Sequence, residues 1–156
     1  MVVDIQVKHA PSYRVASLIH YGPYAPNMFR TEFDQLVKWA QRHHLKTGKW
    51  IMRWIDEPNS KPASKMRSEA SLEIRGKALT EGEIMIKKFP ARTVAYVKFD
   101  PEQISARLVY SGIYGWLRYS DFEAADGPAR EVYEGNPWSN RRAWSNAEVQ
   151  VPVKKR

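Results

Sequence analysis

The chain has 156 residues, of which 43% are hydrophobic and 27% are charged, a balance typical of a single globular domain. No apolar run approaches the ~18 residues that a membrane-spanning helix needs, and we expect no secretory signal. The absence of cysteine excludes disulfides, thiolate metal sites and cysteine nucleophiles, and it suits a cytoplasmic location.

The net charge of +8 is unevenly distributed along the chain. Residues 1–79 carry 13 basic and 7 acidic side chains, whereas residues 80–156 carry 12 and 10. This excess has two interpretations: a basic face for nucleic acid or another polyanion, or an ordinary solvated surface. The basic residues are scattered and form no long block.

The first half of the chain predicts four strands around one helix. Two β-rich runs flank an Ala-Pro-Ser sequence and indicate antiparallel strands joined by a tight turn. Apolar residues at helical spacing follow Asn27, a plausible N-cap, and predict a helix that ends near Leu45, before Gly48. The expected strands are 2–8, 13–19, 50–55 and 68–74.

The second half repeats this order after a connection at 75–82. A helix is expected at about 102–120, and the connections 121–128 and 138–145 are irregular. Each half is therefore β-β-α-β-β with antiparallel sheets, which predicts an α+β fold. The expected strands of this half are 83–89, 92–99, 129–134 and 146–153.

The two halves are related by a constant offset of 79 residues, which takes Pro11 to Pro90. The same offset relates Ile5 to Ile84, Trp54 to Tyr133 and Glu69 to Glu148. We therefore predict one domain, 1–156, built from repeat 1 (about 1–78) and repeat 2 (about 80–156). Packing of two such repeats about a pseudo-twofold axis predicts a central ligand groove.

Strand alternation and the repeat together predict which residues line that groove. Glu131 and Tyr133 share one face of their strand, and the offset places them opposite Met52 and Trp54. The groove would then present Trp50, Met52 and Trp54 from one half and Glu131 and Tyr133 from the other.

An aromatic groove with one carboxylate suits a flat organic molecule, because aromatic faces stack on it and attract a cation. A carboxylate in an apolar groove either raises its pKa or pairs with a cation, so Glu131 is a candidate recognition group or general base. Two simpler interpretations remain open. In the first, Glu131 pairs with Arg130 or Arg53. In the second, the aromatic residues belong to the core.

Three further tyrosines are candidate ligand contacts: Tyr24, Tyr110 and Tyr114. Trp138 and Trp144 flank an Arg-Arg loop, and these two tryptophans either gate the groove or cap the core. The adjacent pair His43-His44 lacks metal-ligand spacing. Neither a nucleophile elbow nor a phosphate-binding glycine motif is present, so we expect no metal and no cofactor.

Several motifs in order resemble the GyrI-like small-molecule-binding domain family over nearly the whole chain. They are Arg14-Val15-Ala16, Gly22-Pro23-Tyr24, Phe33-x-x-Leu36-x-x-Trp39, Lys49-Trp50, Trp54-Ile55-Asp56-Glu57-Pro58, Pro62-x-x-Lys65-x-Arg67-Ser68-Glu69, Glu131-Val132-Tyr133 and Glu148-Val149-Gln150-Val151-Pro152-Val153.

The resemblance implies a duplicated core with a central groove, and it places the family's acidic pocket residue on Glu131. The family includes effector-binding domains of multidrug-sensing transcription regulators and stand-alone gyrase-inhibitory proteins. The resemblance also implies a tyrosine partner for Glu131, at Tyr133, Tyr110 or Tyr114. The chain departs from the family pattern at Trp54, where a tyrosine is common, and at the entry to its second helix.

Three functions follow from this resemblance and from the residues. The first is a stand-alone protein that binds an aromatic, lipophilic, cationic or neutral small molecule. The second is a metal-independent hydrolase of reactive, cyclopropane-type electrophiles, with Glu131 as its catalytic residue. The third is an interaction protein that inhibits DNA gyrase or binds a polyanion such as nucleic acid.

Overall fold

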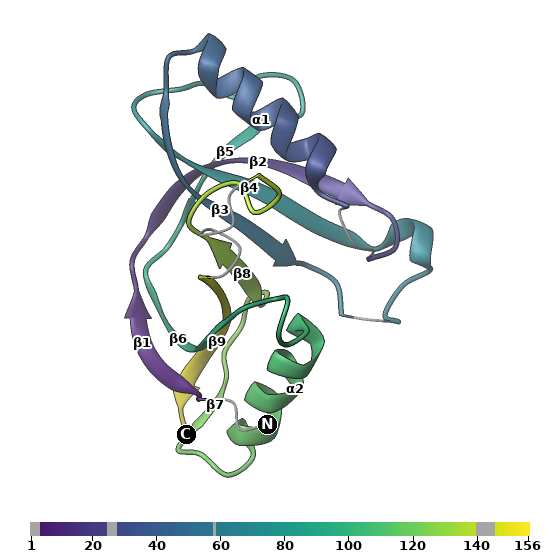
Figure 1. Ribbon diagram of the computed structural model, residues 1–156, viewed down its shortest axis with the longest axis vertical. Helices are drawn as coiled ribbons and strands as arrows, with labels where there is room; N and C mark the ends of the chain where they lie inside the picture. Colours follow the sequence, from purple (N-terminus) through teal and green to yellow (C-terminus); the bar gives the residue numbers. More distant parts are fainter. Residues whose placement is uncertain (1–3, 25–27, 58, 140–145) are drawn as a thin grey trace. The chain divides into compact units, whose positions relative to one another are not determined.

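The computed structural model describes residues 4–24, 28–57, 59–139 and 146–156 (Figure 1). Contacts divide the chain into two compact units. We call Ser12–Pro90 the contiguous unit, and Met1–Pro11 together with Ala91–Arg156 the split unit. Each unit packs one helix against an antiparallel sheet, which confirms the predicted α+β class.

The sheet of the contiguous unit has the strand order β3-β4-β2-β5, with every neighbouring pair antiparallel. Helix α1 covers one face of this sheet (Figure 1). In register on that face, Trp50 lies beside Leu72 and Met52 beside Ala70. The elements are β2 (Tyr13–Tyr21), α1 (Arg30–Arg42), β3 (Lys46–Trp54), the 3-10 helix η1 (Ala63–Lys65), β4 (Arg67–Arg75) and β5 (Met85–Phe89).

Helix α1 forms because its apolar residues recur at helical spacing. Phe33, Leu36 and Ala40 are all buried. The helix ends three residues earlier than predicted, because the chain leaves the right-handed region at His44, where φ is +56°. The predicted N-cap Asn27 lies outside the described residues.

Gly48 does not terminate the helix as predicted but lies inside β3. A Cβ atom there would come within 2.3 Å of Glu73 Oε1. That oxygen accepts a hydrogen bond from the main-chain N–H of Lys49 at 2.9 Å. The glycine therefore makes room for a carboxylate at the β-bulge between Thr47 and Trp50.

The split unit has the strand order β1-β6-β9-β8, with β7 also paired to β9 and all pairs antiparallel. Neither α1 nor α2 combines the length and the apolar composition that crossing a bilayer requires. The elements are β1 (Gln6–Ala10), β6 (Arg92–Phe99), α2 (Ala106–Leu117), β7 (Phe122–Ala124), β8 (Arg130–Tyr133) and β9 (Ala147–Lys155).

Helix α2 is shorter than the predicted 102–120. It begins after Ser105, whose hydroxyl accepts the N–H of Leu108, an ordinary N-cap that the sequence analysis missed. The connection predicted as irregular at 121–128 contains β7, which adds a short strand to β9.

The prediction that each half begins with a hairpin is wrong. Strand β1 pairs with β6 and strand β5 pairs with β2, so the first strand of each half joins the other unit. The two-residue connections begin with Pro11 and Pro90. A two-residue hairpin requires a positive φ at its first loop residue, and proline is fixed near −65°.

Equivalent ion pairs hold the two exchanged strands. Lys8 of β1 lies 2.5 Å from Glu148 Oε1 on β9, and Lys87 of β5 contacts Glu69 on β4. The 79-residue offset relates the two lysines and the two glutamates. This correspondence favours the duplication, which stays a prediction, as do the boundaries of the two repeats.

Candidate functional site

The candidate site of the split unit is the carboxylate of Glu131 on β8. Glu131 is buried, with 5% of its surface exposed. The hydroxyl of Tyr133, two residues along the same strand, donates a hydrogen bond to Glu131 Oε1 at 2.8 Å. The hydroxyl of Tyr110 on α2 donates to Oε2 at 3.4 Å. The carboxylate therefore accepts hydrogen bonds from one strand and one helix.

The environment of Glu131 keeps Tyr133 as a hydrogen-bond donor. Burial raises the pKa of the Tyr133 hydroxyl well above its ordinary range, and the adjacent negative charge of Glu131 raises it further. A carboxylate in such surroundings has lost most of its hydration. It therefore interacts with a nearby cation more strongly than a carboxylate in water does.

The structure also locates the other predicted contacts of this unit. Tyr114 lies one turn after Tyr110 on α2 and is 46% exposed. Arg130, a proposed partner of Glu131, donates from Nε to Gln150 Oε1 at 2.7 Å. Trp138 is half-buried, and Trp144 lies outside the described residues.

In the contiguous unit, the predicted aromatic residues form a cluster on the α1 side of the sheet. Trp50 stacks on Phe33 with ring centroids 4.5 Å apart. Trp54 lies 5.6 Å from Phe29 and 5.0 Å from Tyr24. Trp50 and Met52 are buried, whereas Trp54 and Tyr24 are half-buried. The last two rings are therefore the part of the cluster that has accessible surface.

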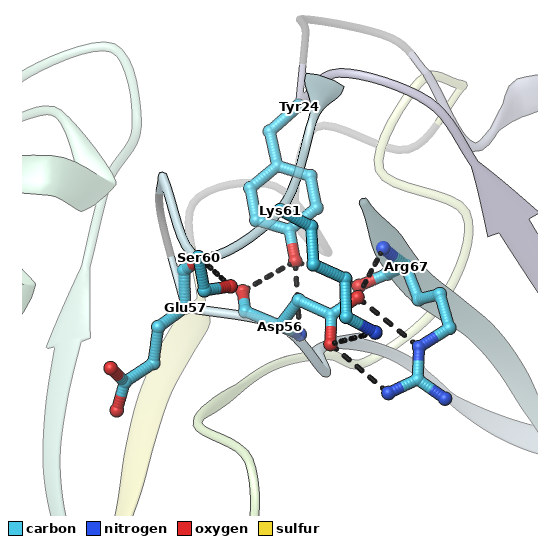
Figure 2. Close-up of polar contacts among 6 residues, drawn as sticks. All are labelled: Tyr24, Asp56, Glu57, Ser60, Lys61 and Arg67. Carbon is cyan, nitrogen blue, oxygen red and sulfur yellow. Dashed lines mark hydrogen bonds and ion pairs between the residues drawn. The ribbon is translucent and has the colours of Figure 1, made fainter. Parts of the chain in front are cut away.

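Tyr24 belongs to a group of four residues joined by hydrogen bonds and ion pairs (Figure 2). We call this group the polar clamp; its members are Tyr24, Asp56, Lys61 and Arg67. The hydroxyl of Tyr24 lies 2.7 Å from the main-chain oxygens of both Asp56 and Arg67. The carboxylate of Asp56 accepts from Arg67 Nη2 at 3.0 Å, from Arg67 Nε at 3.1 Å and from the Arg67 main-chain N–H at 2.8 Å. Lys61 Nζ lies 3.1 Å from the same carboxylate.

Because the clamp contains an ionised carboxylate, the melting temperature of the protein should depend on pH. Hydrogen bonds from Arg67 hold the pKa of the Asp56 carboxyl below its usual range, so the contribution of the clamp to stability is complete above about pH 4 and declines as pH falls toward that lowered pKa. We expect Asp56→Asn to lower the melting temperature at pH 7 and to lower it by less near pH 2. Thermal melts at both pH values test this, with the exposed Glu57→Gln as control. An equal deficit at both values would contradict it.

The sequence analysis missed several of these partners. Helical spacing accounts for Phe29 and Phe33 without predicting that they complete the aromatic cluster. Asp56 and Arg67 appeared only as parts of the family motif. Their opposite charges, on either side of a polar loop that joins two paired strands, were the signal for a contact.

Two other features bear on function. Among the described residues, no group of three or more His, Asp or Glu side chains is placed to hold a metal ion. An open groove of about 510 Å³ lies in the contiguous unit. It is lined by Ser12, Arg14, Ile86, Lys87 and Lys88.

The model of the GyrI-like small-molecule-binding domain matches residues 4–154. The chain belongs to this family. A relative named DNA gyrase inhibitor, from Escherichia fergusonii, is 25% identical over 97% of this chain and 98% of its own length.

Two solved structures show the same fold as this member of the family. The EcmrR C-terminal domain has a TM-score of 0.76 at 19% identity over the whole of both chains, and this chain covers 59% of the EcmrR chain seen in a complex with DNA. SAV2435, solved bound to tetraphenylphosphonium, has a TM-score of 0.56 at 10% identity over 97% of this chain and 94% of its own.

Proposed function

We propose that this GyrI-like domain binds an aromatic, lipophilic organic cation, with Glu131 as the counter-charge. The observation that carries the proposal is the buried carboxylate of Glu131, held by hydroxyls from β8 and α2. A ligand cation would offset the cost of burying that charge. The solved complex of SAV2435 with tetraphenylphosphonium supports this class of ligand.

The aromatic residues of the contiguous unit supply the second part of the proposal. Trp54 and Tyr24 have accessible ring surface, and aromatic faces attract an organic cation. Trp50 and Met52 would support these rings from the buried side. Within the split unit the proposal assigns ligand contacts to Glu131, Tyr133 and Tyr110, and within the contiguous unit it assigns aromatic contacts to Trp54 and Tyr24. Tyr114 is a further candidate at the exposed side of α2.

Calorimetric titration of the protein with tetraphenylphosphonium tests the proposal. We expect saturable binding that also quenches tryptophan fluorescence, and weaker binding of the neutral analogue triphenylphosphine oxide. Equal affinity for the two compounds would remove the counter-charge role of Glu131. Absence of saturable binding for both would overturn the proposed function.

A hydrolase is the second candidate function, because Glu131 and Tyr133 offer a general base and a hydrogen-bond donor side by side. Glu131 would accept a proton from water as the water oxygen bonds to a strained ring carbon. Tyr133 would hydrogen-bond the substrate oxygen that receives electron density as the ring bond breaks. Formation of a water adduct from a cyclopropane-bearing electrophile, lost in Glu131→Gln, would support this function.

A polyanion-binding protein is the third candidate function, and it rests on the groove of the contiguous unit. Arg14 on β2 and Lys88 on β5 lie directly opposite each other, so their positive charges repel. No described residue forms an ion pair with either side chain. Binding of DNA that weakens steeply with salt and ignores Glu131→Gln would support this function.

A further inference from the structure

We propose that Asp56 and Arg67 are positioning residues that set the ring of Tyr24 against Trp54, and thereby set the affinity of the accessible aromatic surface for its ligand. This inference rests on the proposed function for its ligand but not for its geometry. It assigns a role to two charged residues that do not themselves contact the ligand.

The clamp ties together three segments that are distant in sequence. The main-chain N–H groups of Ile55 and Asp56 both point to the main-chain oxygen of Arg67, at 3.2 and 3.3 Å. The N–H of Gly22 donates to the oxygen of Met66 at 2.9 Å. These bonds hold the chain before Tyr24, the chain after Trp54 and the start of β4 in one place.

The hydroxyl of Tyr24 lies at the centre of these bonds. It faces two carbonyl oxygens at 2.7 Å and accepts from the N–H of Asp56 at 3.3 Å. One O–H donates to one carbonyl at a time, so the hydroxyl stays bonded in either orientation. Figure 2 shows this hydroxyl directed at the main chain of residue 56. The far end of the ring is therefore fixed while its faces stay partly accessible.

The carboxylate of Asp56 fixes the rest of the clamp. Its two oxygens meet both Nε and Nη2 of Arg67, a bidentate arrangement that defines orientation as well as distance. The main-chain N–H of Arg67 is a third donor. Loss of this carboxylate would remove the side-chain bonds to Arg67 and leave its carbonyl, which the Tyr24 hydroxyl uses, held by main-chain N–H groups.

The rings respond to the clamp because they adjoin it directly. Trp54 precedes Asp56 by two residues, and its ring lies 5.0 Å from that of Tyr24 at a tilt of 56°. A ring pair held in advance loses less conformational freedom when a ligand binds than a mobile pair does. The clamp therefore acts on affinity by orienting the two rings before the ligand arrives.

The test uses the full-length protein labelled with 5-fluorotryptophan and three variants. Tyr24→Phe removes only the hydroxyl, Asp56→Asn removes the charge and one of the two acceptor oxygens, and Tyr119→Phe is a matched control because Tyr119 is 92% exposed. The fluorine resonance of Trp54 reports ring position without any ligand. The resonance of the fully buried Trp39 reports whether the unit is folded.

We expect the Trp54 resonance to shift and broaden in Tyr24→Phe and Asp56→Asn, while that of Trp39 stays in place. Binding of tetraphenylphosphonium should weaken about threefold to tenfold, the effect of one lost hydrogen bond. Tyr119→Phe should change neither measurement. If Asp56→Asn fails to fold, Tyr24→Phe alone decides the test.

Three outcomes separate this inference from the proposed function. An unmoved Trp54 resonance in Tyr24→Phe overturns the positioning role. A moved resonance with unchanged affinity overturns the link to the ligand. If the wild-type protein does not bind tetraphenylphosphonium, the proposed function fails and the link to affinity fails with it, while the Trp54 resonance still decides the positioning role.

Discussion

Glu131→Gln is expected to weaken binding of tetraphenylphosphonium by about fivefold to 150-fold, because a charged partner contributes about 1–3 kcal/mol. Glutamine has nearly the same size, and its amide oxygen still accepts the Tyr133 hydroxyl that now lies 2.8 Å from Oε1. Removal of a buried charge should leave stability unchanged or raised. Calorimetric titration and urea denaturation of the same sample separate the two effects.

Two comparisons make this expectation specific to the Glu131 charge. Binding of triphenylphosphine oxide, which is neutral, should change less than about threefold in Glu131→Gln. Glu134→Gln removes an exposed charge just after the same strand and should leave both ligands unaffected. Retention of full affinity for the cation in Glu131→Gln would remove Glu131 from the proposed site.

Glu69→Gln is expected to lower the free energy of unfolding by about 3 kcal/mol, the lower end of the range for breaking a buried ion pair. The Glu69 side chain is fully buried, lies 2.7 Å from Arg53 Nε and contacts Lys87 Nζ. The loss of charge leaves two cations beside a neutral amide. Both cations are partly exposed, which keeps the cost near the lower limit.

Urea denaturation measures this loss against a matched surface variant. Glu81→Gln breaks the exposed ion pair with Arg42 and should cost less than about 1 kcal/mol. Equal effects of Glu69→Gln and Glu81→Gln would mean that the buried cluster contributes no more than a surface pair.

The local elements could be predicted because each has a short-range cause. Helical spacing of Phe33, Leu36 and Ala40 places α1, and alternation places Glu131 and Tyr133 on one side of β8. The roles of Glu131 and Tyr133 in ligand binding stay predictions, as does the arrangement of both repeats around one groove.

The strand partners could not be predicted from alternation, because alternation specifies faces and not neighbours. Pro11 and Pro90 did carry the needed signal, since proline excludes the tight hairpin that was predicted. The Tyr110 contact to Glu131 and the Asp56 contact to Arg67 each depend on tertiary packing. Sequence spacing alone does not specify contacts of this kind.

A cut at the midpoint of this 156-residue sequence would separate β5 from the sheet that it completes. Fragment 1–79 would retain β1 without its partner β6 and would lack β5. Fragment 12–90, in contrast, contains all four strands of one sheet. We expect fragment 12–90 to give a cooperative thermal transition by circular dichroism and fragment 1–79 to give none. Fragments, split reporters and domain fusions made from this protein should therefore take their boundaries after Pro11 and Pro90.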